Sequence, residues 1–150
     1  MPDARVHIRR GRRTDFTAVM NVLAASGVAV PPPDRATLRR FRNIVADLGT
    51  DLYLAMVDGT VAGFVHVTYA RQLTVLPQAR LDQLVVAAAF RRRGIGSALL
   101  AFARHRARRR GCADLSCALL SGSAPARQFL EKAGLELTGE WFVQRLNADG

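Results

Sequence analysis

The chain has 150 residues, 49% of them hydrophobic and 23% charged, and its formal net charge is +10 at pH 7. This composition excludes a disordered or fibrous protein, and the length predicts a single domain over residues 1–150. No apolar run approaches the roughly 18 residues that span a bilayer, and Cys112 and Cys117 are too few for a disulfide framework, so we expect a cytoplasmic protein.

Arginine supplies nearly all of the positive charge, and it occurs in clusters. The clusters are at 9–13, 39–42, 91–93 and 104–110. A basic surface can attract nucleic acid, an anionic membrane or a phosphorylated cofactor. No aromatic residues are interleaved with the arginines, as a groove for single-stranded nucleic acid would need. We therefore expect neither a nucleic-acid nor a membrane partner, and interpret every cluster except Arg91–Arg93 as solvated surface.

The first quarter of the chain predicts an edge strand and two helices. Residues 6–9 alternate like a short strand, and an amphipathic pattern follows for which Thr14 is the expected N-cap. Gly27 is expected to end this helix. Asp34 is the expected cap of a second helix that stops at Gly49.

The remainder predicts strands that alternate with helices, beginning with a hairpin whose Asp58-Gly59 pair suits a tight turn. The expected elements are strands at 52–57, 61–69 and 81–86, a helix at 94–110, a strand at 115–119, a helix from Ser123 to near Gly134 and a strand at 141–146. The order βααβββαβαβ predicts a mixed α/β fold.

One segment combines a buried strand, a short loop and a helix that opens with glycines. After Leu81–Val86 come Arg91–Arg93, Gly94 and Gly96. Unpaired N–H groups at a helix start bind phosphate, and glycines permit a close backbone approach. No lysine follows the glycines, as a Walker loop would require, and Leu99 replaces the third glycine of a dinucleotide motif. The segment therefore predicts a site for another pyrophosphate ligand.

Arg91 to Gly96 resembles the acyl-CoA-binding motif of the GNAT superfamily of N-acetyltransferases, Gln/Arg-x-x-Gly-x-Gly/Ala. The element order is similar over nearly the whole chain, and residues 126–135 resemble a second, weaker family motif. The resemblance implies a splayed central sheet flanked by helices. It also implies acyl transfer from acetyl-CoA to a small-molecule or peptide amine that attacks directly in a ternary complex. No Cys or His pair has the spacing of metal ligands, so we expect no metal.

The resemblance further implies where the cofactor lies. The backbone of Leu84 and Val86 would pair with pantetheine, and the amides of Arg92 to Ser97 would wrap the pyrophosphate. The implied cofactor-binding residues are Leu84, Val85, Val86, Arg91, Arg92, Arg93, Gly94, Ile95, Gly96, Ser97 and Ser123. The chain departs from the family at Leu130, where many relatives carry a tyrosine that protonates the thiolate, and at Ser123, which replaces an asparagine.

Asp82 is the candidate catalytic base, because it is the only acid between Gly59 and Cys112 and removal of the amine proton benefits from a base. Alternation places it on the same face as Leu84 and Val86, and relatives often carry glutamate there. The alternative is a structural carboxylate paired with Arg80. His66 and Tyr69, on the preceding strand, are weaker candidates for the acceptor side.

A second function stays open: a catalytically weak acyl-CoA-binding or sensing module. The missing tyrosine favours it, whereas Asp82 argues against it. The segments expected to line the acceptor pocket contain only Asp34 and Glu140 as acids, so we do not expect a polycationic acceptor. Because many relatives dimerise, the resemblance also leaves a homodimer open.

Overall fold

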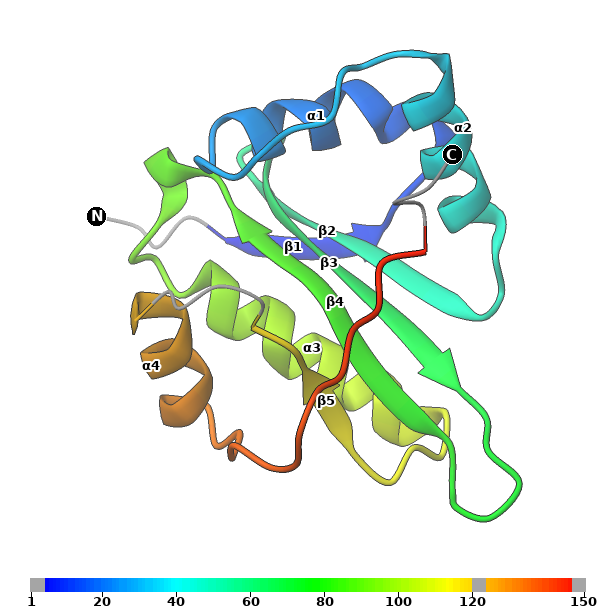
Figure 1. The fold of residues 1–150 in the computed structure, drawn as a ribbon. Coiled ribbons are helices and arrows are strands. Elements are labelled where there is room, and N and C mark those ends of the chain that lie inside the picture. The colour runs from blue at the N-terminus through cyan, green and yellow to red at the C-terminus, as the bar shows by residue number, and fades with distance from the viewer. Residues whose placement is uncertain (1–4, 120–123, 147–150) are drawn as a thin grey trace. The chain divides into compact units, whose positions relative to one another are not determined.

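The computed structural model describes residues 5–119 and 124–146. The chain divides into two compact units, residues 1–118 and residues 119–150. The first unit holds a five-stranded sheet with the strand order β1-β2-β3-β4-β5 (Figure 1). Its strands are Val6–Arg10 (β1), Thr50–Val57 (β2), Thr60–Ala70 (β3), Gln78–Val86 (β4) and Leu115–Cys117 (β5). Neighbours from β1 to β4 are antiparallel, and β5 runs parallel to β4.

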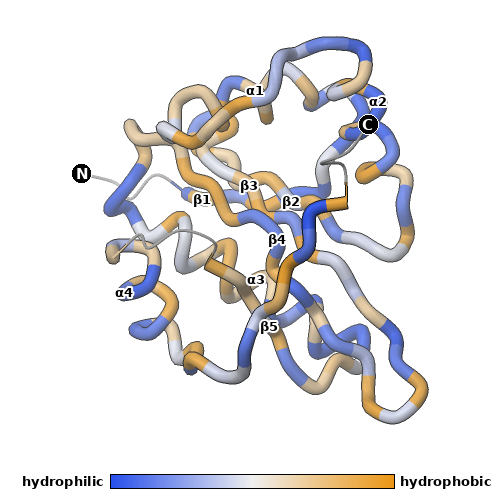
Figure 2. The backbone as a smooth tube through the Cα atoms, in the orientation of Figure 1, coloured by the Kyte–Doolittle hydropathy of each residue, from blue (hydrophilic) through white to orange (hydrophobic). Residues whose placement is uncertain are grey.

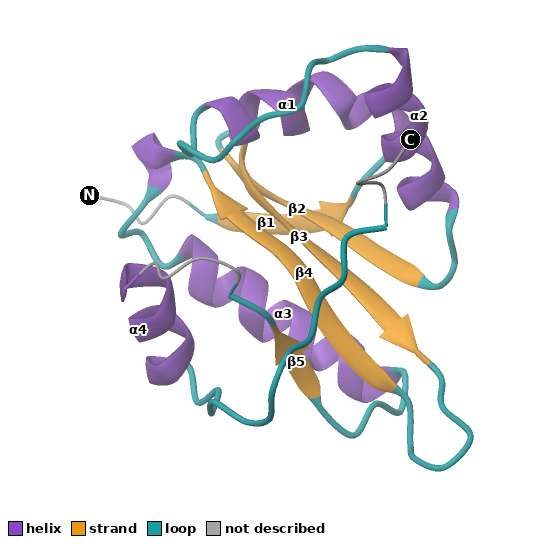
Figure 3. Ribbon diagram, in the orientation of Figure 1, coloured by secondary structure: helices purple, strands orange, loops and turns teal. Residues whose placement is uncertain are grey.

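Helices cover both faces of this sheet (Figures 1 and 3). The helices of the first unit are α1 (Phe16–Ala24), α2 (Arg35–Ala46) and α3 (Ile95–Arg109), with short 3-10 turns at Arg13–Asp15 and Ala88–Phe90. Helices α1 and α2 lie over one face, which we call the α1/α2 face, and α3 packs on the opposite face, the α3 face. No helix in the described ranges is long and apolar enough to cross a bilayer.

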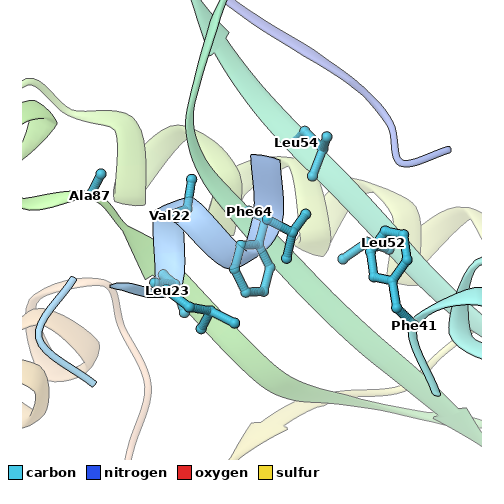
Figure 4. Packing of buried hydrophobic residues seen from close by; sticks show 9 residues of the cluster. Val22, Leu23, Phe41, Leu52, Leu54, Phe64 and Ala87 are labelled. Atoms are coloured by element: carbon cyan, nitrogen blue, oxygen red, sulfur yellow. The ribbon is translucent and has the colours of Figure 1, made fainter. Parts of the chain in front are cut away.

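Consecutive side chains of strand β3 point to opposite faces of the sheet. Because helices cover both faces, β3 is buried on both of them. Phe64 joins the core of the α1/α2 face with Val22 and Leu54 (Figure 4), and Val85 belongs to the same cluster. Its neighbour Val65 faces α3 and is likewise 1% exposed. Figure 2 shows hydrophobic residues along α1 and the central strands. Burial of each such side chain contributes about 1.5–3 kcal/mol to the free energy of unfolding. The middle of the sheet is therefore stable and holds the groups at its edge in place.

Several local expectations are confirmed. The Asp34 carboxylate caps α2 by accepting from the backbone N–H of Thr37 at 2.9 Å. Asp58 and Gly59 both have positive φ, 49° and 79°, as the tight turn of the β2–β3 hairpin requires. The predicted mixed α/β order is present from β1 to the helix that follows β5.

Thr14 is not the cap of α1. It lies inside the 3-10 turn, and Asp15 occupies the N-cap position instead. The Asp15 carboxylate accepts from the backbone N–H of Arg12 at 2.7 Å and from the guanidinium of Arg9 at 2.8 Å. These bonds form a tight turn, and α1 therefore begins at Phe16, one residue later than a Thr14 cap would place it.

The C-terminal ends of three elements differ from expectation. Helix α1 ends at Ala24, ahead of Gly27, and α2 ends at Ala46, ahead of Gly49. The Asp47 carboxylate accepts from the N–H of Gly49 at 2.7 Å, so the chain turns away before the glycine. Strand β5 is Leu115–Cys117, shorter than the expected 115–119.

The second unit contains α4 (Ala124–Lys132), which agrees with the expected helix there. The N–H of Leu135 bonds to the carbonyl of Leu130, and Gly134 has φ 90°, a glycine-dependent helix ending. The expected last strand at 141–146 is wrong: within the described part of this unit, the segment pairs with no strand. Its alternating pattern suits a strand, but a strand exists only where a neighbour takes its backbone hydrogen bonds.

Candidate functional site

The sheet opens between β4 and β5. The two strands pair only at Ala79 with Leu115, Arg80 with Ser116 and Leu81 with Cys117. From residue 82 to residue 86, β4 continues beside β3 with no described strand on its other side. Backbone groups of this stretch that point away from β3 are therefore available to another partner.

The opening begins at a β-bulge in β4. Gln83 pairs with His66 and Leu81 pairs with Val67, so Asp82 is an extra residue with no partner of its own on β3. Bulges of this kind re-aim side chains and are frequent beside active sites.

The bulge corrects the expected orientation of Asp82. Its side chain contacts Thr68 and Arg80, and lies near His66, all on the α1/α2 face. Leu84 pairs with Val65 and therefore lies on the α3 face. Asp82 and Leu84 are on opposite faces, because the extra residue interrupts the alternation on which the expectation was based.

The Asp82 carboxylate is held by two donors. The Thr68 hydroxyl donates to Oδ2, and Nε of Arg80 donates to Oδ1 at 2.7 Å. The Arg80 ion pair that the sequence offered as an alternative is thus present. The side chain keeps 23% of its surface exposed, so ligands can reach the carboxylate.

His66 lies beside this carboxylate, with Nδ1 4.0 Å from Oδ2 of Asp82. Burial lowers the pKa of His66, and the negative charge of Asp82 partly opposes this shift. Nε2 is buried and has no hydrogen-bond partner among the described residues. The ring is therefore neutral at neutral pH, and one of its nitrogens is unused.

The loop between β4 and α3 presents a row of free amides. Arg92 and Gly94 both have positive φ, 63° and 75°, and the first bond that closes α3 runs from the N–H of Ala98 to the carbonyl of Gly94, 3.0 Å. In the described ranges, no acceptor is in place for the N–H groups of residues 92–97. Such consecutive amides at a helix start form an anion-binding concavity.

The three arginines of this loop differ in their surroundings. Arg91 donates to the carbonyl of Ser26, beyond the end of α1, and Arg93 lies over the ring of Phe90, 5.5 Å from its centroid. The Arg92 side chain has no described partner and is exposed. Two of the three therefore fix the loop, and Arg92 is the one available to a ligand.

The remaining cofactor-binding residues expected from the sequence differ in how much of each residue a ligand can reach. The side chains of Val85 and Ile95 are buried in the core, so only their backbone can meet a ligand. Val86 lies beside Gly63, and Ser97 is exposed at the start of α3. Ser123 lies outside the described residues.

Tyr69 does not line the face that carries Asp82. Its hydroxyl donates to Oδ2 of Asp51 at 2.6 Å, on the α3 face. Burial and the bond to Asp51 raise the pKa of Tyr69. Asp51 is only 2% exposed and also accepts from three guanidinium groups, those of Arg10, Arg106 and Arg110, at 3.1–3.3 Å. Sequence reasoning missed this cluster; a lone aspartate in the apolar run of β2 was its one indication.

Comparison with known proteins identifies the family. Residues 16–135 match the family model described as "Acetyltransferase (GNAT) family". The chain belongs to the GNAT acetyltransferases. It is accordingly a transferase, and the sheet that opens between β4 and β5 belongs to an acetyltransferase domain. No curated protein matches the sequence.

Several solved structures are similar to this protein over nearly the whole chain. A transcriptional regulator from Bacillus halodurans is 25% identical, with a TM-score of 0.85 over 95% of this chain and 100% of that one. An aminoglycoside N-acetyltransferase in complex with CoA is 20% identical, with a TM-score of 0.81 over 96% of each chain. Glucosamine-6-phosphate N-acetyltransferase from Arabidopsis thaliana is 17% identical, with a TM-score of 0.79 over 95% and 99%.

Proposed function

We propose that this GNAT protein transfers an acetyl group from acetyl-CoA to an amine by direct attack in a ternary complex. One observation carries the proposal: the edge of β4 that no described strand pairs, residues 82–86, continues along the chain into the loop with the free amides of residues 92–97. A gap that offers strand-like backbone bonds, followed by an anion site, matches the chemistry of a pantetheine arm and a pyrophosphate. The CoA complex of the aminoglycoside N-acetyltransferase supports the same cofactor.

The proposed cofactor site follows β4 and the loop after it. Pantetheine would bond to the backbone of Leu84–Val86 and the pyrophosphate to the amides of Arg92 to Ser97, with the Arg92 guanidinium adding positive charge. Arg91 and Arg93 would hold the loop in shape rather than touch phosphate. Ser123 stays in the proposal on the family resemblance alone.

Asp82 is the proposed acidic group that assists removal of the amine proton. As the N–C bond forms, the thioester C–S bond breaks and the sulfur leaves with the electron pair. Leu130, on α4, cannot donate a proton to it, and the Tyr69 hydroxyl is engaged by Asp51. A thiol has a pKa near 8.5, so its thiolate can depart unprotonated or take a proton from water.

Gly96→Val tests the cofactor site. A β-branched side chain at the phosphate loop should abolish acetyl-CoA binding, measured by calorimetry, while circular dichroism shows an intact fold. Ala101→Val is the matched control, because it adds the same side chain to an exposed position of the same helix. If folded Gly96→Val protein kept wild-type affinity, the proposed cofactor site would be wrong.

An amine panel tests transfer itself, with CoA thiol release as the measurement. The panel contains alanine amide, free amino acids, a peptide amino terminus, glucosamine 6-phosphate, spermidine and kanamycin. We expect a neutral or carboxylate-bearing amine to be the best acceptor. Cofactor binding without release for any amine would favour the alternative, an acyl-CoA-sensing module. The single domain, the cytoplasmic location and the homodimer remain predictions.

A further inference from the structure

The imidazole of His66 lies where the bulge of β4 meets β3. It pairs across the sheet with Leu52 on one side and with Gln83 on the other. The bulge turns Asp82 toward the same face, and Nδ1 of His66 lies 4.0 Å from its Oδ2. A regular strand would have kept these two groups on opposite faces, so the extra residue in β4 is what brings them together.

The two donors on Asp82 fix its orientation toward the ring. Thr68 holds Oδ2, the oxygen nearest His66, and Arg80 holds Oδ1. An ionised carboxylate only accepts hydrogen bonds. At 4.0 Å the ring and the carboxylate are not hydrogen-bonded, but the negative charge favours the hydrogen of neutral imidazole on the nitrogen that faces it, Nδ1. The lone pair is left on Nε2.

That lone pair is unsatisfied. Nε2 is buried without a donor among the described residues, in a side chain that is 13% exposed. Leaving a buried acceptor unpaired costs free energy, and native proteins rarely do so. An amine N–H is the kind of donor that this nitrogen lacks.

The charges around His66 are consistent with a ring that is neutral at rest and can accept a proton. The charged groups that act on it are Asp82, Arg80 and Asp47. Burial keeps the ring neutral, and Arg80 acts in the same direction, whereas Asp82 and Asp47 favour the imidazolium. A neutral base with a negative charge beside it can accept a proton and be stabilised once it holds it.

We propose that His66 is the catalytic base and that Asp82 is its positioning residue; this rests on the acetyl transfer proposed above. The amine nitrogen attacks the thioester carbonyl carbon, the C–S bond breaks, and the sulfur leaves with the electron pair. Nε2 is buried in the ligand-free protein, so the bound amine must displace the side chains that cover it before its proton passes to this nitrogen. The imidazolium, stabilised by Asp82, returns this proton to solvent after the product leaves.

His66→Gln tests the base directly, with His105→Gln as the matched control, since His105 is exposed on α3. With the best acceptor of the panel, kcat/KM should fall by about 10²–10⁴ in His66→Gln, with the affinity for acetyl-CoA unchanged. The wild-type profile should rise with pH through the lowered pKa of His66, and this rise should be absent in His66→Gln. An activity within twofold of the control would overturn the proposal.

Asp82→Asn separates the two roles. Asp82 raises the pKa of His66, so its loss should move the rise of the profile to lower pH as well as reduce the rate. If Asp82 were itself the base, Asp82→Asn would abolish the rise, and His66→Gln would retain it. That result would also overturn the proposal.

A measurement that needs no acceptor separates this inference from the proposed function. Imidazole ¹⁵N NMR of the full chain should show His66 as the Nδ1–H tautomer, with a pKa below its ordinary value that falls further in Asp82→Asn. An Nε2–H tautomer, or a pKa indifferent to Asp82→Asn, would overturn the pairing. If the NMR result holds but no amine is acetylated, the proposed function fails, and the catalytic role of His66 is withdrawn with it.

Discussion

Two aspartates on opposite faces of the sheet have opposite surroundings. Asp51, on the α3 face, is 2% exposed and accepts bonds from Tyr69 and from three arginines. Asp82, on the α1/α2 face, keeps 23% of its side chain exposed and accepts from Thr68 and Arg80. The donors Thr68 and Tyr69 are adjacent residues of β3, and each hydroxyl serves the aspartate on its own face.

The difference shows that partners and access, rather than residue type, decide what a carboxylate can do. Asp51 is enclosed by donors and ties β1, β2, β3 and α3 together. Asp82 is oriented by fewer donors beside a neutral histidine and an open strand edge. The first arrangement suits stability, and the second suits chemistry. Substitutions that affect one face but not the other test this division.

Asp82→Asn should produce the largest effect, confined to activity. Loss of the carboxylate that stabilises the imidazolium of His66 should reduce kcat/KM at neutral pH by up to the full effect of losing the base, about 10²–10⁴, equivalent to about 3–5 kcal/mol. Partial recovery is expected as the pH approaches the pKa of the amine. The free energy of unfolding should change by less than about 1 kcal/mol, because only a partly exposed ion pair is lost. Near-wild-type activity at every pH would give Asp82 a structural role.

Asp51→Asn should affect stability instead. Removing the charge leaves Arg106 and Arg110 close together without their shared counter-ion, which typically costs about 3–5 kcal/mol. Urea unfolding measures the loss, and Asp114→Asn, at an exposed position, is the control. Affinity for acetyl-CoA should be unchanged at temperatures where the variant is folded. A loss no larger than that of the control would contradict the view that this cluster joins the elements.

Tyr69→Phe and Thr68→Val remove the hydroxyls singly, and smaller effects are expected. Tyr69→Phe takes one donor from a charged acceptor, worth about 1.5–3 kcal/mol of unfolding free energy. Thr68→Val should cost less stability but reduce kcat several-fold, because Asp82 loses a donor that orients it. The two variants should therefore separate stability from turnover. If each variant reduced both stability and kcat to the same extent, the proposed difference between the two faces would be wrong.

The pH dependence of stability should show the smallest effects. Burial raises the pKa of Asp51, but hydrogen bonds from Arg106 and Tyr69 outweigh it and hold this pKa below its usual value. Its contribution is present above about pH 3.9 and is lost as the pH falls toward the folded pKa. Asp51→Asn should remove this dependence from melting curves.

His66 should also make the folded protein less stable as the pH falls, but in a higher pH range than Asp51. Its folded pKa is lowered, chiefly by burial, so below about pH 6.5 the unfolded chain takes up a proton that the folded protein refuses. Stability should therefore decline from pH 6.5 toward the folded pKa, and melting temperatures of His66→Gln should lack this decline. A decline identical to that of the wild type would show that His66 is not its source.

Features with local causes could be predicted from the sequence. The Asp58-Gly59 turn, the Asp34 cap and the strand–loop–helix around Gly94 depend on residues within a few positions of one another, and all are present. The element order followed from periodicity, except for the strand expected at 141–146. That strand depended on a partner, which periodicity cannot supply.

The candidate site was predictable as a location but not as an arrangement. Asp82 and the phosphate loop stand out in sequence, yet one extra residue in β4 reverses the face that Asp82 occupies, and a bulge has no pattern of its own there. The pairing of His66 with Asp82 depends on this bulge. The donors of Asp51 on α3 come from 55 and 59 positions away, beyond the reach of local patterns.

The adjacent hydroxyls of β3 also bear on how the chain finds its native strand pairing. A slip of β3 by one residue would turn Tyr69 toward the α1/α2 face and Thr68 toward the α3 face. Asp51 would then lose its hydroxyl donor although its own side chain is buried, and Asp82 would face a bulky ring in place of a small side chain. The slipped pairing would be penalised on both faces at once. The hydroxyls of Thr68 and Tyr69 thus favour the native alignment of β3 over a slip of one residue.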